Sequence, residues 1–258
     1  MKTVFLYLSV LGIFLSSCNL FDDKGVHVIR QKVVYVSMDQ QMESQARRPQ
    51  SDRDTSYIEY ILKNYDLVNI KDLDSSIQVD LRYADTNNFL KRDFYDGLNN
   101  AYFNCETALR VCAAQYYLKQ INPDLSILVL DASRPQHIQQ MMWDSLKVLP
   151  DKKPFYLAPP EETSLHNYGA AVDATIIDMT TGNMLDMGTR FDHFGVLSEP
   201  IYEEKFLKMG LLTQKAYENR LLLRKVMQRA KLNPITSEWW HFSICNKEEA
   251  AKRFALIK

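Results

Sequence analysis

The sequence lacks an excess of charge of either sign. Its 258 residues carry 31 basic and 32 acidic side chains, which gives a formal net charge of -1. A protein that binds nucleic acid needs a positive excess to displace counterions from the phosphates. The charge balance therefore argues against a nucleic-acid partner, and it says little about small substrates.

Cysteine is scarce as well. If Cys18 is set aside with the N-terminal leader, only Cys105, Cys112 and Cys245 remain, and no pair or triplet of them has zinc-finger spacing. Cys105 and Cys112 lie about two turns apart on a predicted helix, which is beyond disulfide reach. An odd number of cysteines leaves at least one thiol unpaired in an oxidising compartment. We expect three buried thiols that pack as small apolar side chains.

Long hydrophobic runs are absent except at the N-terminus. Lys2 precedes an apolar run over residues 4–15, and small residues lead from there to Cys18. The run is short for a transmembrane helix and is typical of a secretory signal. Its end resembles a bacterial lipobox, in which the cysteine is lipidated and becomes the new N-terminus. An ordinary cleaved signal and an uncleaved anchor are the alternatives, and Asn19 suggests, by the same resemblance, sorting to the outer membrane.

These features divide the chain into three parts. We expect a lipoprotein signal peptide over residues 1–17, a lipid-anchored tether over residues 18–56 and one globular domain over residues 57–258. The tether is assigned because residues 39–56 are rich in Gln, Arg, Ser and Asp. The chain is then an exported periplasmic or cell-surface lipoprotein that meets the membrane through its lipid anchor only. No protein partner is implied.

The globular part mixes helices and short strands. Periodicity and capping residues predict helices over residues 100–121, 135–146 and 213–232. Alternating or continuous apolar runs predict strands over residues 26–36, 77–83, 125–130, 172–178 and 239–244. Their order lacks regular βαβ spacing, so we expect an α+β fold in which helices flank a largely antiparallel central sheet.

Two segments far apart in the chain carry chemistry. The first is Ser164-Leu-His166-Asn-Tyr-Gly169-Ala-Ala171-Val-Asp173, and the second is Glu238-Trp-Trp-His241. A catalytic zinc commonly takes three protein ligands and leaves one position for water, with a separate carboxylate as the proton acceptor. His166, Asp173 and His241 satisfy that ligand count, which leaves Glu238 for the water.

The spacing of the second segment restricts its geometry. Glu238 and His241 would face opposite sides of a straight strand, because side chains alternate. They converge only if a turn, bulge or twist intervenes, or if Glu238 precedes the strand. From the residues alone, the cluster could equally be one ligand pair with unrelated polar neighbours.

The pattern S-x-H-x-x-G-x-A-x-D followed by E-x-x-H resembles the zinc D,D-peptidases of peptidase family M15. That group contains D-Ala-D-Ala carboxypeptidases and VanX-type dipeptidases. Further blocks resemble the VanX-type branch, in the same order over residues 77–245: Leu81-Arg-Tyr-Ala84 with Asn88-Phe89, Asp131-Ala-Ser-Arg134-Pro135, Met187-Gly-Thr-Arg-Phe-Asp192 and Ser237-Glu-Trp-Trp-His241-Phe. The resemblance implies the hedgehog-like fold of these zinc peptidases.

The resemblance also implies roles at the metal. His166, Asp173 and His241 would bind one Zn²⁺ per chain, and Glu238 would serve first as base and then as acid. Arg134 would stabilise the oxyanion, for which a permanently charged guanidinium with several donors is suited. A structural salt bridge beside a helix start is the alternative for Arg134.

Substrate contacts follow from the same resemblance. Asp192 matches the position that receives the substrate ammonium, with a turn-capping aspartate as the alternative. Ser164 matches a residue near the substrate, although it could equally cap the loop before His166. Ser133 departs from the family, which commonly has an aromatic residue before the arginine, and this leaves the shape of the pocket open.

We therefore expect residues 57–258 to form a zinc dipeptidase that hydrolyses D-Ala-D-Ala. An enzyme that counters glycopeptide antibiotics must act on this dipeptide in the cytoplasm, so an exported one fits turnover of dipeptides released from peptidoglycan. A D,D-carboxypeptidase acting on peptidoglycan stem peptides is one alternative, and a noncatalytic cell-wall-binding lipoprotein is another. The presence of both Glu238 and Arg134 argues against the second, because a binding module needs neither a base nor an oxyanion donor.

Overall fold

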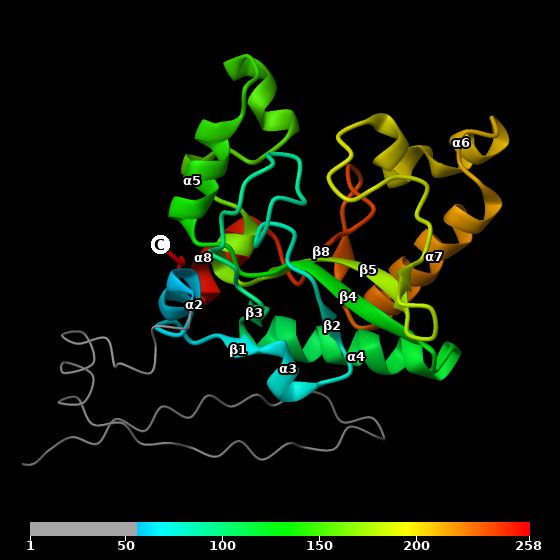
Figure 1. The fold of residues 1–258 in the computed structure, drawn as a ribbon, viewed down its shortest axis with the longest axis horizontal. Coiled ribbons are helices and arrows are strands. Elements are labelled where there is room, and N and C mark those ends of the chain that lie inside the picture. Colours follow the sequence, from blue (N-terminus) through cyan, green and yellow to red (C-terminus); the bar gives the residue numbers. More distant parts are fainter. Residues whose placement is uncertain (1–55) are drawn as a thin grey trace, which may run out of the picture.

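Strands β4 (Leu125–Asp131) and β5 (Ala171–Asp178) form the centre of the fold in a computed structural model that describes residues 56–258 (Figure 1). The expected leader, Cys18, the strand over residues 26–36 and the tether up to residue 55 lie outside the described residues. Within residues 56–258, no helix combines the length and the apolar character needed to cross a lipid bilayer.

Short elements surround these two strands. In chain order, the other elements are α2 (Tyr57–Leu62), β1 (Val68–Asn69), α3 (Ile70–Leu73), β2 (Gln78–Val79), β3 (Tyr102–Phe103), α4 (Cys105–Ile121), α5 (Gln136–Ser145), the 3₁₀ turns η2 (Pro150–Phe155), η3 (Pro160–Glu162) and η4 (Leu165–Tyr168), β6 (Asn183–Met184), η5 (Val196–Ser198), η6 (Pro200–Tyr202), α6 (Glu203–Lys208), α7 (Gln214–Arg229), β7 (Asn233–Pro234), β8 (His241–Ser243) and α8 (Lys247–Arg253).

The main sheet has six strands in the order β2-β4-β5-β8-β7, with β6 paired to β5. The pairings of β4, β6 and β8 with β5, and of β7 with β8, are antiparallel, whereas β2 runs parallel to β4. A small antiparallel pair, β1 and β3, lies apart from this sheet. The α+β class is as predicted, but the sheet is mixed at β2. The physical reason is the helical crossover through α4 between β2 and β4, a connection that parallel strands require.

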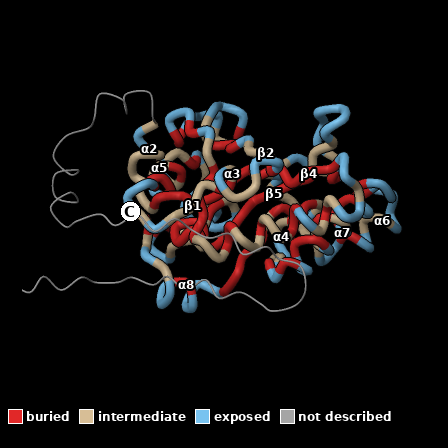
Figure 2. Tube along the Cα trace, turned by 90° about the horizontal axis from the view of Figure 1, so that it is seen from below, coloured by how far each residue is buried: buried red, intermediate tan, exposed pale blue. Residues whose placement is uncertain are grey.

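Helix α4 covers one face of the sheet, where it contacts β4 (Figure 1). Val172, Ala174 and Ile176 of β5 are fully buried, in one core with the apolar face of α4. Figure 2 shows buried stretches of the chain gathered in the middle of the molecule, with α6 at one end. Because side chains alternate along a strand, Asp173 and Thr175 point to the face away from α4.

The longest predicted elements agree with the structure. The helix predicted over residues 213–232 is α7, and the Thr213 hydroxyl caps it by accepting a hydrogen bond from the amide of Ala216 at 3.0 Å. The strand predicted over residues 172–178 is β5, and the turn after it contains Gly182 at φ 71°.

Other boundaries differ. The helix predicted over residues 100–121 begins only at Cys105, because Tyr102–Phe103 form β3. The strand predicted over residues 77–83 is reduced to Gln78–Val79, although the amides of Asp80 and Arg82 still donate to carbonyls of β4. The strand predicted over residues 239–244 is only His241–Ser243.

The cysteines also differ in part from the expectation. Cys245 is buried, whereas Cys105 and Cys112 are half-buried on α4. The expectation of three buried thiols is therefore right for Cys245 only.

Candidate metal centre and active site

A row of three polar residues crosses the sheet. Asp131 of β4 is paired with Asp173 of β5, and Asp173 is paired with His241 of β8. A bulge between Val129 and Asp131 shifts the register of β4. Val129 pairs with Ala174, and Asp131, two residues further along, pairs with Asp173, the direct neighbour of Ala174. Directly opposed residues on adjacent strands have Cβ atoms about 4.5–5.5 Å apart. The sheet itself therefore places Asp173 and His241 side by side.

His166 reaches this row from the short turn η4. Ser164 caps the turn: its hydroxyl accepts from the His166 amide at 3.4 Å, and its own amide donates to the Asn167 side chain at 2.6 Å. The turn ends at Gly169, whose φ is 62° and where an added Cβ would lie 2.8 Å from the amide nitrogen of Asn104. Ser164 thus has the capping role given above as its alternative, and its contact with substrate stays a prediction.

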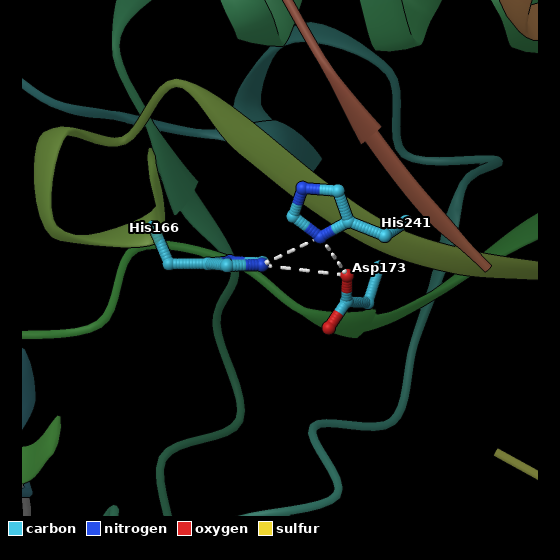
Figure 3. Close-up of side chains that lie close together, drawn as sticks. All are labelled: His166, Asp173 and His241. Carbon is cyan, nitrogen blue, oxygen red and sulfur yellow. Dashed lines mark hydrogen bonds and ion pairs between the residues drawn. The ribbon is translucent and has the colours of Figure 1, made fainter. Parts of the chain in front are cut away.

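The three side chains converge on one point (Figure 3). His166 Nε2 lies 3.3 Å from both His241 Nδ1 and Asp173 Oδ1, and His241 Nδ1 lies 2.8 Å from Asp173 Oδ1. Zinc bonds of about 2.0–2.1 Å in a tetrahedron set neighbouring ligand atoms roughly 3.3 Å apart. Two of the three separations match this edge, and the third, at 2.8 Å, is shorter, so the three atoms would offer a metal ion three neighbouring ligand positions. These residues form a possible metal site, as predicted.

The main chain fixes the orientation of His166. Its Nδ1 lies 2.7 Å from the carbonyl oxygen of Ala132, to which only a protonated nitrogen can donate. The lone pair is then on Nε2, which faces His241 Nδ1 and Asp173 Oδ1. Although burial lowers the pKa of His166, the carboxylates of Asp173 and Asp131 raise it overall. Burial raises the pKa of Asp173, yet His166 and His241 hold it far below its ordinary value. Asp173 is therefore ionised.

Glu238 lies beside this centre but outside the triangle of ligand atoms. It precedes β8, so the strand geometry that would separate Glu238 from His241 does not apply. Its pKa is raised, first by burial and also by Asp173, while His241, His166 and Arg134 act in the opposite direction. A carboxylate whose pKa is shifted toward neutrality next to a metal centre is suited to moving protons.

Arg134 is 4% exposed and joins two parts of the site. Its guanidinium pairs with Asp131 and donates to the Gln139 side chain at 3.3 Å. Its backbone amide donates to the carbonyl of His166 at 2.9 Å. The salt bridge considered as the alternative for Arg134 is thus present. The salt bridge does not use all the N–H donors of the guanidinium. The role of Arg134 toward an oxyanion stays a prediction.

Asp192 lies in a loop with a left-handed backbone, at φ 58°. The Tyr83 hydroxyl donates to its carboxylate, and within residues 56–258 no basic side chain is within ion-pair distance of it. Its pKa is raised well above the ordinary value, mainly because the carboxylate is desolvated and also because Asp173 repels it. Such a group gains most from a cationic partner.

Two residues here were left without a role by the sequence. Tyr83 and Asp131 each lie inside a motif block, but only the structure shows that one touches Asp192 and the other holds Arg134. Asn88, from the same block as Tyr83, holds the loop in shape, since its side chain donates to the carbonyls of Arg82, Asp85 and Arg92. Ser133 stands where the family commonly has an aromatic residue, and it is buried beside Gly169. This difference from the family pattern therefore lies in the core.

Known proteins are similar to this chain over most of its described part. The sequence model of the D-Ala-D-Ala dipeptidase family, peptidase family M15, matches residues 63–257. A D-alanyl-D-alanine dipeptidase of Escherichia coli is 30% identical over 179 residues, which cover 69% of this chain and 84% of that protein. A protein of the same name from Synechocystis is 29% identical over 168 residues, which cover 52% and 65%. One from Enterococcus faecium is 32% identical over 79 residues, which cover 31% and 36%.

The matched range contains both motif segments and the sheet that joins them. The family predicted from the motifs is therefore confirmed. The chain belongs to the D-Ala-D-Ala dipeptidase family of peptidases.

Proposed function

We propose that this chain is a zinc-dependent dipeptidase that hydrolyses D-Ala-D-Ala. The observation that carries this proposal is the triangle of buried His166 and Asp173 with half-buried His241, with Glu238 beside it and not part of it. The names of the relatives from Escherichia coli and Synechocystis, both D-alanyl-D-alanine dipeptidases, support the same substrate.

His166 Nε2, His241 Nδ1 and Asp173 Oδ1 are the atoms that would hold the zinc ion. When bound, the ion supplies Lewis-acid chemistry, which lowers the pKa of water and polarises the peptide carbonyl. Two nitrogens and one carboxylate oxygen are the donor set of a catalytic zinc site. Zinc is thus favoured over a hard cation such as Mg²⁺ or Ca²⁺, which prefers oxygen ligands.

Each remaining group has a task that its surroundings suit. Glu238 takes a proton from the attacking water and delivers it to the departing amine, as its raised pKa allows. Arg134, held in place by Asp131 and Gln139, offers positive charge to the oxygen of the peptide carbonyl. Asp192 accepts the free amine of the dipeptide, and Ser164 lies at the edge of the same turn as His166.

Asp192 separates the dipeptidase from a D,D-carboxypeptidase. A carboxypeptidase acts on acylated stem peptides, which have no ammonium group to neutralise this carboxylate. An acylated substrate would leave the desolvated Asp192 without a partner, which strongly disfavours its binding.

The test is turnover by the purified protein on D-Ala-D-Ala and on N-acetyl-D-Ala-D-Ala, before and after chelation and with zinc added back. We expect hydrolysis of the free dipeptide only, lost on chelation and restored by zinc. Faster hydrolysis of the acetylated peptide would favour the carboxypeptidase. Absence of turnover by the zinc-loaded protein would favour the alternative of a noncatalytic cell-wall-binding protein.

The proposal extends to location. Residues 1–17 act as a lipoprotein signal peptide, and Cys18 carries the lipid. Residues 18–56 tether the catalytic domain on the outer side of the inner membrane. The lipid anchor lies in the outer membrane if Asn19 directs the protein there. Full-length protein should then leave the cytoplasmic pool of D-Ala-D-Ala unchanged, and a form without residues 1–18 should deplete it. Depletion by the full-length protein, with Cys18 unlipidated, would contradict this location.

A further inference from the structure

Arg220 of α7 is a buried cation that the proposed mechanism does not use. It is 1% exposed, and its guanidinium donates in three directions. Nε donates to the carbonyl of Met187 at 2.6 Å, Nη2 to the carbonyl of Leu197 at 3.1 Å and Nη1 to the carboxylate of Glu203 at 3.4 Å. Two of its three partners are thus main-chain carbonyls of one segment, residues 187–197, which we name the Asp192 segment.

The Asp192 segment depends on such contacts for its shape. It contains no strand or α-helix, and its 3₁₀ turn begins only at Val196. In its middle, Asp192 has a φ of 58°, in the left-handed region that favours glycine. Figure 1 shows the segment, in yellow, beside α7. Because a guanidinium is a rigid planar fork, Arg220 fixes the two ends of the segment relative to each other.

The same cluster reaches the second half of the active site. Trp239, the neighbour of Glu238, donates from Nε1 to the Thr189 hydroxyl at 2.8 Å. Thr189 belongs to the Asp192 segment, and its hydroxyl lies 3.0 Å from that of Ser198. The Arg220 guanidinium also lies 5.9 Å from the Trp239 ring centre. One buried cluster therefore connects Asp192 with the residue that follows the proposed base.

We infer that Arg220 is a positioning residue that sets where Asp192 stands relative to Glu238, and thereby the preference for a substrate with a free amine. This inference rests on the proposed function, in which Asp192 accepts the ammonium group and Glu238 acts on the peptide bond. The distance between these two groups must match the length of one residue of the dipeptide, so a displaced segment weakens binding of the free amine.

Arg224 provides a matched control. It lies one turn further along α7 and binds the same Glu203 carboxylate, with Nη2 2.7 and 2.6 Å from its two oxygens. In the described part of the chain its hydrogen bonds all go to Glu203. Arg224→Lys thus perturbs the same buried carboxylate without touching the Asp192 segment.

The experiment compares Arg220→Lys, Thr189→Val and Arg224→Lys with the wild type, in the zinc-loaded full-length protein. KM and kcat are measured for D-Ala-D-Ala and N-acetyl-D-Ala-D-Ala, together with zinc content and thermal unfolding. Arg220→Lys removes charge-assisted bonds to the segment, so it should raise KM for D-Ala-D-Ala about tenfold and reduce the preference for the free amine by a similar factor. Thr189→Val should act in the same direction, whereas Arg224→Lys should leave both quantities within about twofold.

KM and the preference between two substrates do not depend on the fraction of enzyme that is folded, so a merely structural role would not move them. Unchanged values in Arg220→Lys and Thr189→Val would overturn the inference, and Thr189→Val decides alone if Arg220→Lys does not fold. If the wild type shows no preference for the free amine, the role of Asp192 is wrong and the inference falls with it. If the wild type shows the preference and both variants keep it, only the inference is wrong.

Discussion

The hydroxyl oxygen of Tyr83 lies 3.1 Å from both carboxylate oxygens of Asp192. One neutral donor thus serves a carboxylate that is desolvated and repelled by Asp173. The phenol lowers the pKa of Asp192, but burial outweighs it. The carboxylate is therefore left incompletely compensated in the folded protein until a cation reaches it.

Asp192→Asn should stabilise the protein at neutral pH while weakening binding of the free dipeptide. The folded-state pKa of Asp192 is raised, so its carboxylate costs stability once the pH exceeds the unfolded-state pKa of about 3.9. Asparagine has the same shape and tolerates positive φ. Thermal unfolding at pH 7 should shift upward by about 2–4 °C, or about 1 kcal/mol, and the gain should vanish near pH 4. A less stable variant at pH 7 would show that the carboxylate is already compensated.

Glu238→Gln should abolish most turnover and leave zinc content near one per chain. The side chain lies outside the ligand triangle, so its loss removes proton transfer, which contributes about 10²- to 10⁴-fold, but no bond to metal. His241→Ala is the comparison, because it removes a ligand atom and should lower zinc occupancy. Metal analysis beside steady-state kinetics checks both variants. Loss of zinc in Glu238→Gln would mean that the ligand and base roles are wrongly divided.

Asp131→Asn should destabilise the fold and reduce activity. Asp131 is fully buried against Arg134, and breaking a buried ion pair costs about 3–5 kcal/mol because the remaining charge has no partner. Asp80→Asn serves as the control: it breaks a pair with Arg82 at 3.1 Å in which the aspartate is 47% exposed, and it should cost at most about 1 kcal/mol. Denaturant unfolding measures both. Equal effects would indicate that Asp131 does not hold Arg134 in solution.

Gly169→Ala should destabilise the fold and weaken zinc binding. The position combines a φ of 62° with a Cβ site only 2.8 Å from the amide nitrogen of Asn104, and the turn that it ends carries His166. Gly182→Ala has the same backbone strain, at φ 71°, with no atom within 4 Å of the added Cβ. Gly182→Ala should cost about 1–3 kcal/mol, and Gly169→Ala should cost more. Similar losses in both variants would rule out the steric contact as the cause.

The possible metal site of His166, Asp173 and His241 could be predicted from the sequence, because the types and order of these residues follow a known pattern. The strand that carries Asp173 could be predicted too, since its β-branched run is long enough to show its period. Whether Glu238 lies in β8 or before it could not be predicted, because the start of a strand as short as β8 is not visible in the sequence.

Asp131 and Arg220 show a different limit. Asp131 reaches the site through a bulge, and no local pattern marks the residue at which a register shifts. Arg220 is one of several charged residues on α7, and only tertiary packing turns it toward the two carbonyls it binds. Both are long-range relationships, which a single sequence does not record.

The Ile257 backbone adds a late contact to the centre: its carbonyl accepts from the Gln136 amide at 2.7 Å, and its amide donates to the Asn167 carbonyl at 2.8 Å. These bonds tie together the chain next to Arg134 and the turn that carries His166. A nascent chain that has not reached His241 lacks one residue of the possible metal site, and one that has not reached Ile257 lacks this tie. If residues 1–17 are the proposed signal peptide, they leave the ribosome well before the possible metal site can assemble. Under the proposed location, export factors would have time to engage the chain before it could cleave D-Ala-D-Ala in the cell that makes it.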